Sequence, residues 1–167
     1  DDAAGKATVI VKQTQKTGKY FKLLIAIDVY QGAAKTRYNV WANNAIDSFT
    51  IPYTKRPDLI NVDGDKVMLW SKKDNNNLDN YIHQYKYAGS YLDRKEAIDY
   101  AATKADDPKA VELIRTALND KYHGLRSYTI GKTDLKKEGI RKATEEVLTG
   151  LATTDKNALV RAGAIGK

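Results

Sequence analysis

The sequence contains no cysteine, which excludes disulfide frameworks, thiolate nucleophiles and cysteine-based metal sites. Histidine occurs only at His83 and His123. A zinc site of the H-E-x-x-H type needs two histidines one turn apart on one helix, and neither histidine has such a partner. We therefore expect neither of them to bind a metal, and we expect no cofactor within this chain.

Long apolar runs are absent as well. No stretch of about 18 apolar residues occurs, so we expect no membrane span. The N-terminus has no signal-peptide pattern. Because the chain starts at Asp1 and its last residues, Ala162–Lys167, continue an apolar helical pattern, we expect it to be a piece of a longer protein. These features leave the compartment open between cytoplasmic and periplasmic or exported.

Positive charge is in excess but not concentrated. The chain has 28 basic and 21 acidic residues, for a net charge of +7. Residues 1–75 hold 12 of the basic and 8 of the acidic residues, so the excess is shared between the two halves. Only short pairs such as Lys72-Lys73 and Lys136-Lys137 occur, whereas nucleic-acid binding needs clustered charge. We expect a solvated basic surface and no nucleic-acid partner.

The first half of the chain has the pattern of β-strands. Short segments of period two are separated by turn residues, which is typical of a small antiparallel sandwich. We expect Asp63-Gly64-Asp65 to form a tight turn with a positive φ at Gly64. The predicted strands are Thr8–Gln13, Tyr20–Tyr30, Lys35–Ala42, Ile46–Ile51, Leu59–Val62 and Lys66–Trp70.

The second half has the pattern of helices. Apolar residues recur at helical spacing, and Asn77 and Asp107 are suitable N-caps. We expect six helices, which begin near Leu78, Asp93, Pro108, Tyr122, Thr133 or Asp134, and Thr154 or Asp155. The predicted fold is α+β in two segregated domains, an antiparallel β-sandwich over residues 1–75 and an α-helical repeat domain over residues 76–167.

A repeat lies within the helical half. Asp120, Arg126 and Ile130 recur 35 residues later as Asp155, Arg161 and Ile165. Arg94 and Ile98 form a weaker copy upstream. A period in the thirties is typical of HEAT-like or armadillo-like solenoids. Six residues turn an arginine about 240° away from its aspartate, so we expect the arginine to reach backbone carbonyls of the adjoining helix pair.

Several residue groups could be taken for functional sites. Asp63 and Asp65 have too few oxygen ligands near them for a cation. Gly163-Ala164-Ile165-Gly166 lacks the strand and the lysine of a phosphate loop. The spacing of the tyrosines fits packing between helices better than stacking on nucleic-acid bases; they are Tyr81, Tyr85, Tyr87 and Tyr91, beside Lys86 and Arg94. We predict no catalytic, cofactor-binding or metal-binding residue, and no enzymatic activity for this chain.

Two runs support a family resemblance. I-P-Y-T-K-R-P-D-L-I-N-V-D-G-D-K-V-M-L-W-S-K-K-D-N, from Ile51, is followed by L-D-N-Y-I-H-Q-Y-K-Y-A-G-S-Y-L-D-R-K-E-A-I, from Leu78. Together with L-R-S-Y-T-I and V-R-A-G-A-I, they resemble the region after the catalytic domain in zinc aminopeptidases similar to aminopeptidase N. The family's H-E-x-x-H-x18-E zinc signature and its G-A-M-E-N segment are absent, so no catalytic residue is carried over.

The resemblance implies a structural role. The sandwich would bridge a catalytic domain of the same polypeptide to a helical domain, which would enclose the active-site cavity and limit the access of peptide substrates. Zinc would belong to that catalytic domain. The alternative is a protein–protein interaction module with no link to peptidase activity, in which the solenoid binds another protein.

Overall fold

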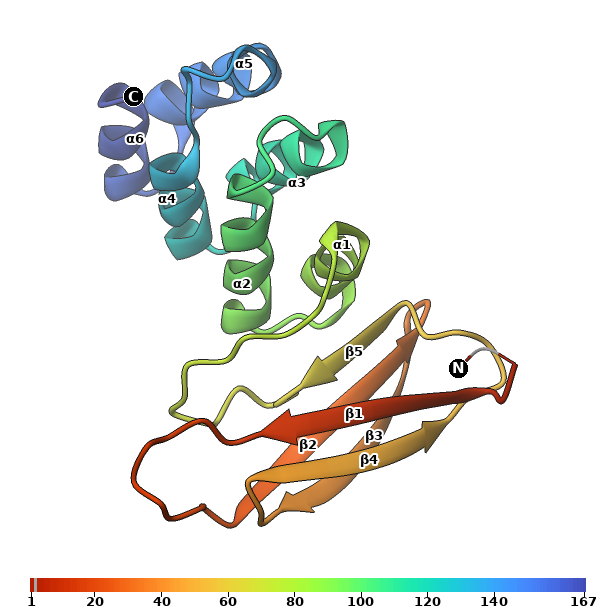
Figure 1. The fold of residues 1–167 in the computed structure, drawn as a ribbon. Helices are drawn as coiled ribbons and strands as arrows, with labels where there is room; N and C mark the ends of the chain where they lie inside the picture. The colour runs from red at the N-terminus through yellow and green to blue at the C-terminus, as the bar shows by residue number, and fades with distance from the viewer. Residues whose placement is uncertain (2) are drawn as a thin grey trace. The chain divides into compact units, whose positions relative to one another are not determined.

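The computed structural model describes residue 1 and residues 3–167. Its contacts divide the chain into two compact units, Asp1–Asn75 and Asn76–Lys167. The first unit holds antiparallel sheets and the second holds six packed helices, so the chain is α+β in segregated parts (Figure 1). Among the described residues, no helix is long and apolar enough to cross a membrane.

The β unit consists of two sheets that share one apolar core. One sheet pairs β1 with β4, and the other has the order β3-β2-β5 (Figure 1). Val9 and Val11 of β1 face Ile25 and Ile27 of β2 across the core, which gives the arrangement of a small β-sandwich. The strands are β1 (Lys6–Lys12), β2 (Leu23–Gln31), β3 (Ala34–Ala42), β4 (Ile46–Pro52) and β5 (Leu59–Val62).

Strand β2 begins later than its apolar pattern predicts. The prediction started this strand at Tyr20, but Phe21 lies outside it and is 62% exposed. The side chain of Gln13 binds both backbone groups of Phe21, at 2.8 Å from Nε2 to the carbonyl oxygen and at 2.9 Å from the amide nitrogen to Oε1. A side chain therefore takes the place of a strand neighbour at this point.

The predicted strand Lys66–Trp70 is wrong. Asp63 and Lys66 adopt positive φ angles of 59° and 53°, while Gly64, for which we predicted this conformation, does not. The carboxylate of Asp63 accepts hydrogen bonds from the amides of Val67 and Met68, each at 3.2 Å. These amides are thereby withdrawn from strand pairing.

The six helices form three consecutive pairs. Within the helical unit α1 packs on α2, α3 contacts α2, α4 and α5, and α6 packs on α4 and α5 (Figure 1). The Asn77 and Asp107 caps are confirmed. The helices are α1 (Leu78–Tyr87), α2 (Tyr91–Ala102), α3 (Pro108–Leu118), α4 (His123–Lys132), α5 (Glu138–Thr154) and α6 (Ala158–Ile165).

The last two helices start later than predicted, and in both cases a side chain is engaged elsewhere. Thr133 donates its hydroxyl to the Thr129 carbonyl, at the end of α4. Asp134 closes a turn by accepting from the amide of Lys136, so α5 starts only at Glu138. The cap of α6 is Asn157 rather than Thr154 or Asp155.

Candidate functional site

The repeated arginines and aspartates form a ladder across the helix pairs. Nη1 of Arg94, on α2, lies 2.7 Å from both carboxylate oxygens of Asp120, in the α3–α4 loop. On α4, Nε and Nη2 of Arg126 lie 2.7 Å and 2.8 Å from the two oxygens of Asp155, in the α5–α6 loop. Arg94 and Arg126, each on the second helix of its pair, therefore bind the loop of the following pair, and we call these two contacts the Arg–Asp ladder.

The ladder corrects one detail of the prediction. Arg126 does reach the adjoining helix pair, but through the carboxylate of Asp155 rather than through backbone carbonyls. The carbonyl contact is made within its own pair, because Nη1 of Arg126 donates to the carbonyl of Asp120 at 2.8 Å. The arginine thus fixes its own loop with one edge of the guanidinium and the next loop with the other edge.

The side chains of the second ladder contact are largely buried. The side chain of Asp155 is 4% exposed and that of Arg126 is 15% exposed. The hydrogen bond from Arg126 lowers the pKa of Asp155 below its ordinary value, so the carboxylate stays ionised at neutral pH. Asp155 also accepts from the amide of Asn157 at 2.8 Å. Both carboxylate oxygens of Asp155 therefore accept hydrogen bonds within the fold.

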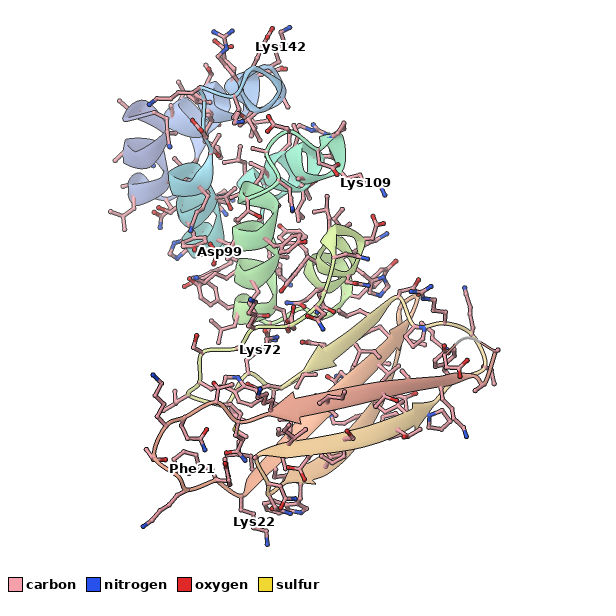
Figure 2. The ribbon with its side chains drawn as sticks, in the orientation of Figure 1. Phe21, Lys22, Lys72, Asp99, Lys109 and Lys142 are labelled. Carbon is pink, nitrogen blue, oxygen red and sulfur yellow. The ribbon has the colours of Figure 1, made fainter. Side chains whose placement is uncertain are left out.

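A second charged group ties α2 to α4. Figure 2 labels Asp99, which belongs to α2. Asp99 accepts a hydrogen bond from the Tyr128 hydroxyl and lies 2.7 Å from Nζ of Lys132, and both partners belong to α4. Burial raises the pKa of Asp99, but the hydrogen bonds from Lys132, Lys95 and Tyr128 outweigh it and leave the pKa below the ordinary value.

The first ladder contact borders a cavity of about 970 Å³ in the helical unit. Ile82, Pro108 and Leu113 contribute apolar side chains to its wall, and Lys109 and Asp79, which form an ion pair at 2.7 Å, line it as well. Cavities of this size and lining are typical of sites that bind a ligand or a peptide segment. The other lining residues are Tyr85, Lys86, Gly89, Arg94, Glu112, Thr116, Asn119, Asp120 and Lys121.

The polar groups in the wall of this cavity are engaged with one another. The Tyr85 hydroxyl donates to Asp120 at 2.8 Å, and the amide of Tyr122 donates to the same carboxylate at 2.8 Å. Burial, with the hydrogen bond to Asp120, raises the pKa of Tyr85 above its usual range. The Tyr85 phenol therefore stays protonated at neutral pH, and it serves as a hydrogen-bond donor to Asp120.

The tyrosines singled out in the sequence lie mostly between helices. The ring of Tyr81 stacks on Tyr100 of α2 at a centroid distance of 4.4 Å, and both Tyr81 and Tyr85 pack against the apolar core. Tyr91, 41% exposed, meets Tyr122 edge to face at 5.8 Å. The prediction of interhelical packing is confirmed for Tyr81 and Tyr85, whereas the ring of Tyr87 contacts His83 on its own helix.

The V-D-G-D segment carries a separate charged cluster in the β unit. Asp28 is fully buried, and Arg37 binds both of its oxygens, at 2.6 Å through Nε and 2.8 Å through Nη2. Nη1 of Arg37 then reaches Asp65 at 2.7 Å. A Cβ added to Gly64 would lie 2.3 Å from Oδ2 of Asp28, so the glycine is required for close approach and not for its φ angle.

The residues considered as metal ligands do not come together. Asp63 binds backbone amides and Asp65 binds Arg37. His83 lies on α1, beside the ring of Tyr87, and His123 lies at the start of α4. Within the part of the chain that the structure describes, no group of three or more histidine or acidic side chains could hold a metal ion.

Sequence reasoning found the members of the Arg–Asp ladder but missed the cavity. The 35-residue recurrence identifies Asp120, Arg126 and Asp155, and the weaker upstream copy identifies Arg94. The residues around the cavity come from α1, α2, α3 and the loops after α1 and α3, and apart from Arg94 and Asp120 they share no sequence signal, because they meet only when the two pairs stack. In comparisons with known proteins, no family model matches the chain and no curated protein is significantly similar to it.

Proposed function

We propose that this chain is a non-catalytic part of an aminopeptidase N-like zinc metallopeptidase. The β-sandwich connects a catalytic domain to the helical domain, and the helical domain encloses the active-site cavity of the parent enzyme. The observation that carries the proposal is the order of motifs along the chain, in which the V-D-G-D-K segment ends a small sandwich and helix pairs follow.

The contacts in both units suit a structural role. The carboxylates of Asp28, Asp120 and Asp155 are all bound by arginines, which fixes the loops and strands that carry them. The zinc, the nucleophilic water and the general base of the parent enzyme would come from the catalytic domain. For peptide substrates, this chain would form part of the enclosure around the active-site cavity and would limit their access to the active site.

The test begins with the reading frame upstream of the codon for Asp1. An H-E-x-x-H motif followed by a glutamate is expected there. The protein made from the whole frame should bind one zinc per chain and release N-terminal residues from peptides. A frame without the motif, or a whole protein without zinc-dependent peptidase activity, would refute the proposal.

A second measurement tests the enclosing role. In the whole protein, Arg126→Ala should loosen the helical domain and change the ratio of activity on long peptides to activity on an aminoacyl arylamide. Arg115→Ala is the matched control, because Arg115 pairs with Glu112 on its own helix and not with a neighbouring helix pair among the described residues. Equal ratios in both variants and the parent would argue against a helical wall around the active site.

The alternative function is a protein–protein interaction module. The cavity beside α1 and α3 favours it, since its apolar wall could receive a segment of another protein. The two proposed functions predict different sequences upstream of Asp1, with a zinc motif for the peptidase and none for the interaction module. Absence of any zinc motif, together with retained folding of this chain alone, would favour the interaction module.

A further inference from the structure

The second helix of each pair carries an arginine followed four residues later by an isoleucine. These are Arg94 and Ile98 on α2, Arg126 and Ile130 on α4, and Arg161 and Ile165 on α6. Ile98 is 0% exposed and Ile130 is 2% exposed, but Ile165 is 73% exposed. Ile130 belongs to the core that α5 and α6 complete, and the same position on α6 has no such cover among the described residues.

Arg161 is held in the conformation of Arg126. Its Nη1 donates to the carbonyls of Asp155 and Lys156 at 2.7 Å and 3.3 Å. Nη1 of Arg126 makes the same two contacts, with Asp120 and Lys121, at 2.8 Å and 3.4 Å. The Nε–Nη2 edge of Arg126 then binds a carboxylate of the next loop, whereas no described carboxylate lies at that edge of Arg161.

An apolar strip accompanies this open edge. Leu159, Ala162 and Ile165 are exposed at one-turn intervals along α6, and Leu159 is 72% exposed. Single exposed apolar residues are normal on a protein surface, but a helix with an apolar strip normally buries it against a neighbour. Arg161 and Ile165 stand at the positions that Arg126 and Ile130 occupy on α4, while Leu159 and Ala162 make the strip on α6 more apolar than the corresponding Gly124 and Ser127.

We propose that the outer face of α6 is a docking surface for a helix pair that carries an aspartate in its interhelical loop. The aspartate binds the Nε–Nη2 edge of Arg161, and the apolar side of the pair covers Leu159 and Ile165. A second copy of this chain is not the occupant, because its first loop, Ala88-Gly89-Ser90, has no acidic residue to offer. This inference concerns the surface of α6 alone and stands whether or not the parent protein is a peptidase.

The test extends the full chain with a second copy of residues 133–167, which supplies a helix pair with the counterpart of Asp155 in its loop. Arg161→Gln and a change of the appended aspartate to asparagine are made singly and together, and unfolding in urea is followed by circular dichroism. Each single change should lower the folded-to-unfolded ratio of the last two pairs by roughly tenfold or more, and the double change should cost no more than the larger single change. In the extended chain, the methyl groups of Ile165 should become protected from solvent.

Three results would overturn the proposal. Additive effects of the two changes would mean that Arg161 does not bind the appended aspartate. Solvent-exposed Ile165 methyl groups in the extended chain would mean that the surface does not accept a helix pair. Dimers of the unextended chain in sedimentation, lost with Arg161→Gln, would make a second copy the occupant.

Discussion

Replacing Arg126 by alanine should strongly destabilise the helical unit. The substitution removes two contacts with Asp155 and one with the carbonyl of Asp120. It leaves the carboxylate of Asp155, 4% exposed, without its cation in a place that water barely reaches. Breaking a buried ion pair on one side costs about 3–5 kcal/mol, and the partial exposure of Arg126 reduces this value, so we expect a loss of about 3 kcal/mol.

Arg115 provides the matched comparison. It pairs with Glu112 one turn away, and the two side chains are 48% and 58% exposed. An exposed pair of this kind contributes little, so Arg115→Ala should cost less than about 0.5 kcal/mol. The comparison is made by urea unfolding with far-UV circular dichroism as the helical signal. Equal and small losses for both variants would refute the structural role of the ladder.

The pH dependence of the same variants gives an independent check. Because Arg126 lowers the pKa of Asp155 in the folded state, the ion pair stabilises the fold above the unfolded pKa of about 3.8, and this contribution disappears as the pH falls through the folded pKa. The difference in unfolding free energy between the parent and Arg126→Ala should therefore be largest near pH 7 and shrink below about pH 4. A difference that stays constant from pH 7 to pH 3 would show that lost packing, and not the charge, explains the effect.

Three further predictions concern other parts of the chain. Gly64→Ala should lower the unfolding free energy of the β unit by more than about 2 kcal/mol, because the new methyl group meets Asp28. Gly150→Ala, in open space inside α5, should raise the unfolding free energy by about 0.5–1 kcal/mol. Urea unfolding compares the two variants, and an unchanged stability of Gly64→Ala would contradict the close approach of Gly64 to Asp28. Limited trypsin digestion should cut first at Lys73, which is exposed in the Ser71–Asn77 stretch, where the chain has neither helix nor strand. Lys72 should be cut more slowly, because it pairs with Asp74 at 3.1 Å. First cuts within β2 would speak against a packed sandwich. The isolated chain should bind no stoichiometric zinc after dialysis and should not hydrolyse aminoacyl arylamides, and metal analysis showing one zinc per chain would contradict its non-catalytic role.

Much of the fold follows from local sequence patterns. The period-two alternation in β3 places Tyr38, Val40 and Ala42 on the more buried face and exposes Arg37 and Trp41. Capping chemistry sets the starts of α1 and α3 in the same way. These features depend on neighbours along the chain, so the sequence is sufficient to predict them.

The errors arise where a polar side chain has two possible partners. Asp155 is a good N-cap by composition, but in the structure it binds Arg126 from another helix pair, and Asn157 caps α6 instead. Asp63 captures two amides that a strand would have used. Which partner prevails depends on contacts between residues far apart in sequence, and local patterns do not contain that information.

The Arg–Asp ladder also has a mechanical consequence. Each contact joins the second helix of one pair to the loop of the next, through short bonds between fixed groups. A pulling force along the stack would therefore meet stiff links at the loops and softer apolar contacts elsewhere, and the pairs would detach one at a time rather than slide. The helical unit should therefore resist extension where the Arg–Asp ladder joins its pairs, and it should bend more easily where only apolar contacts join them.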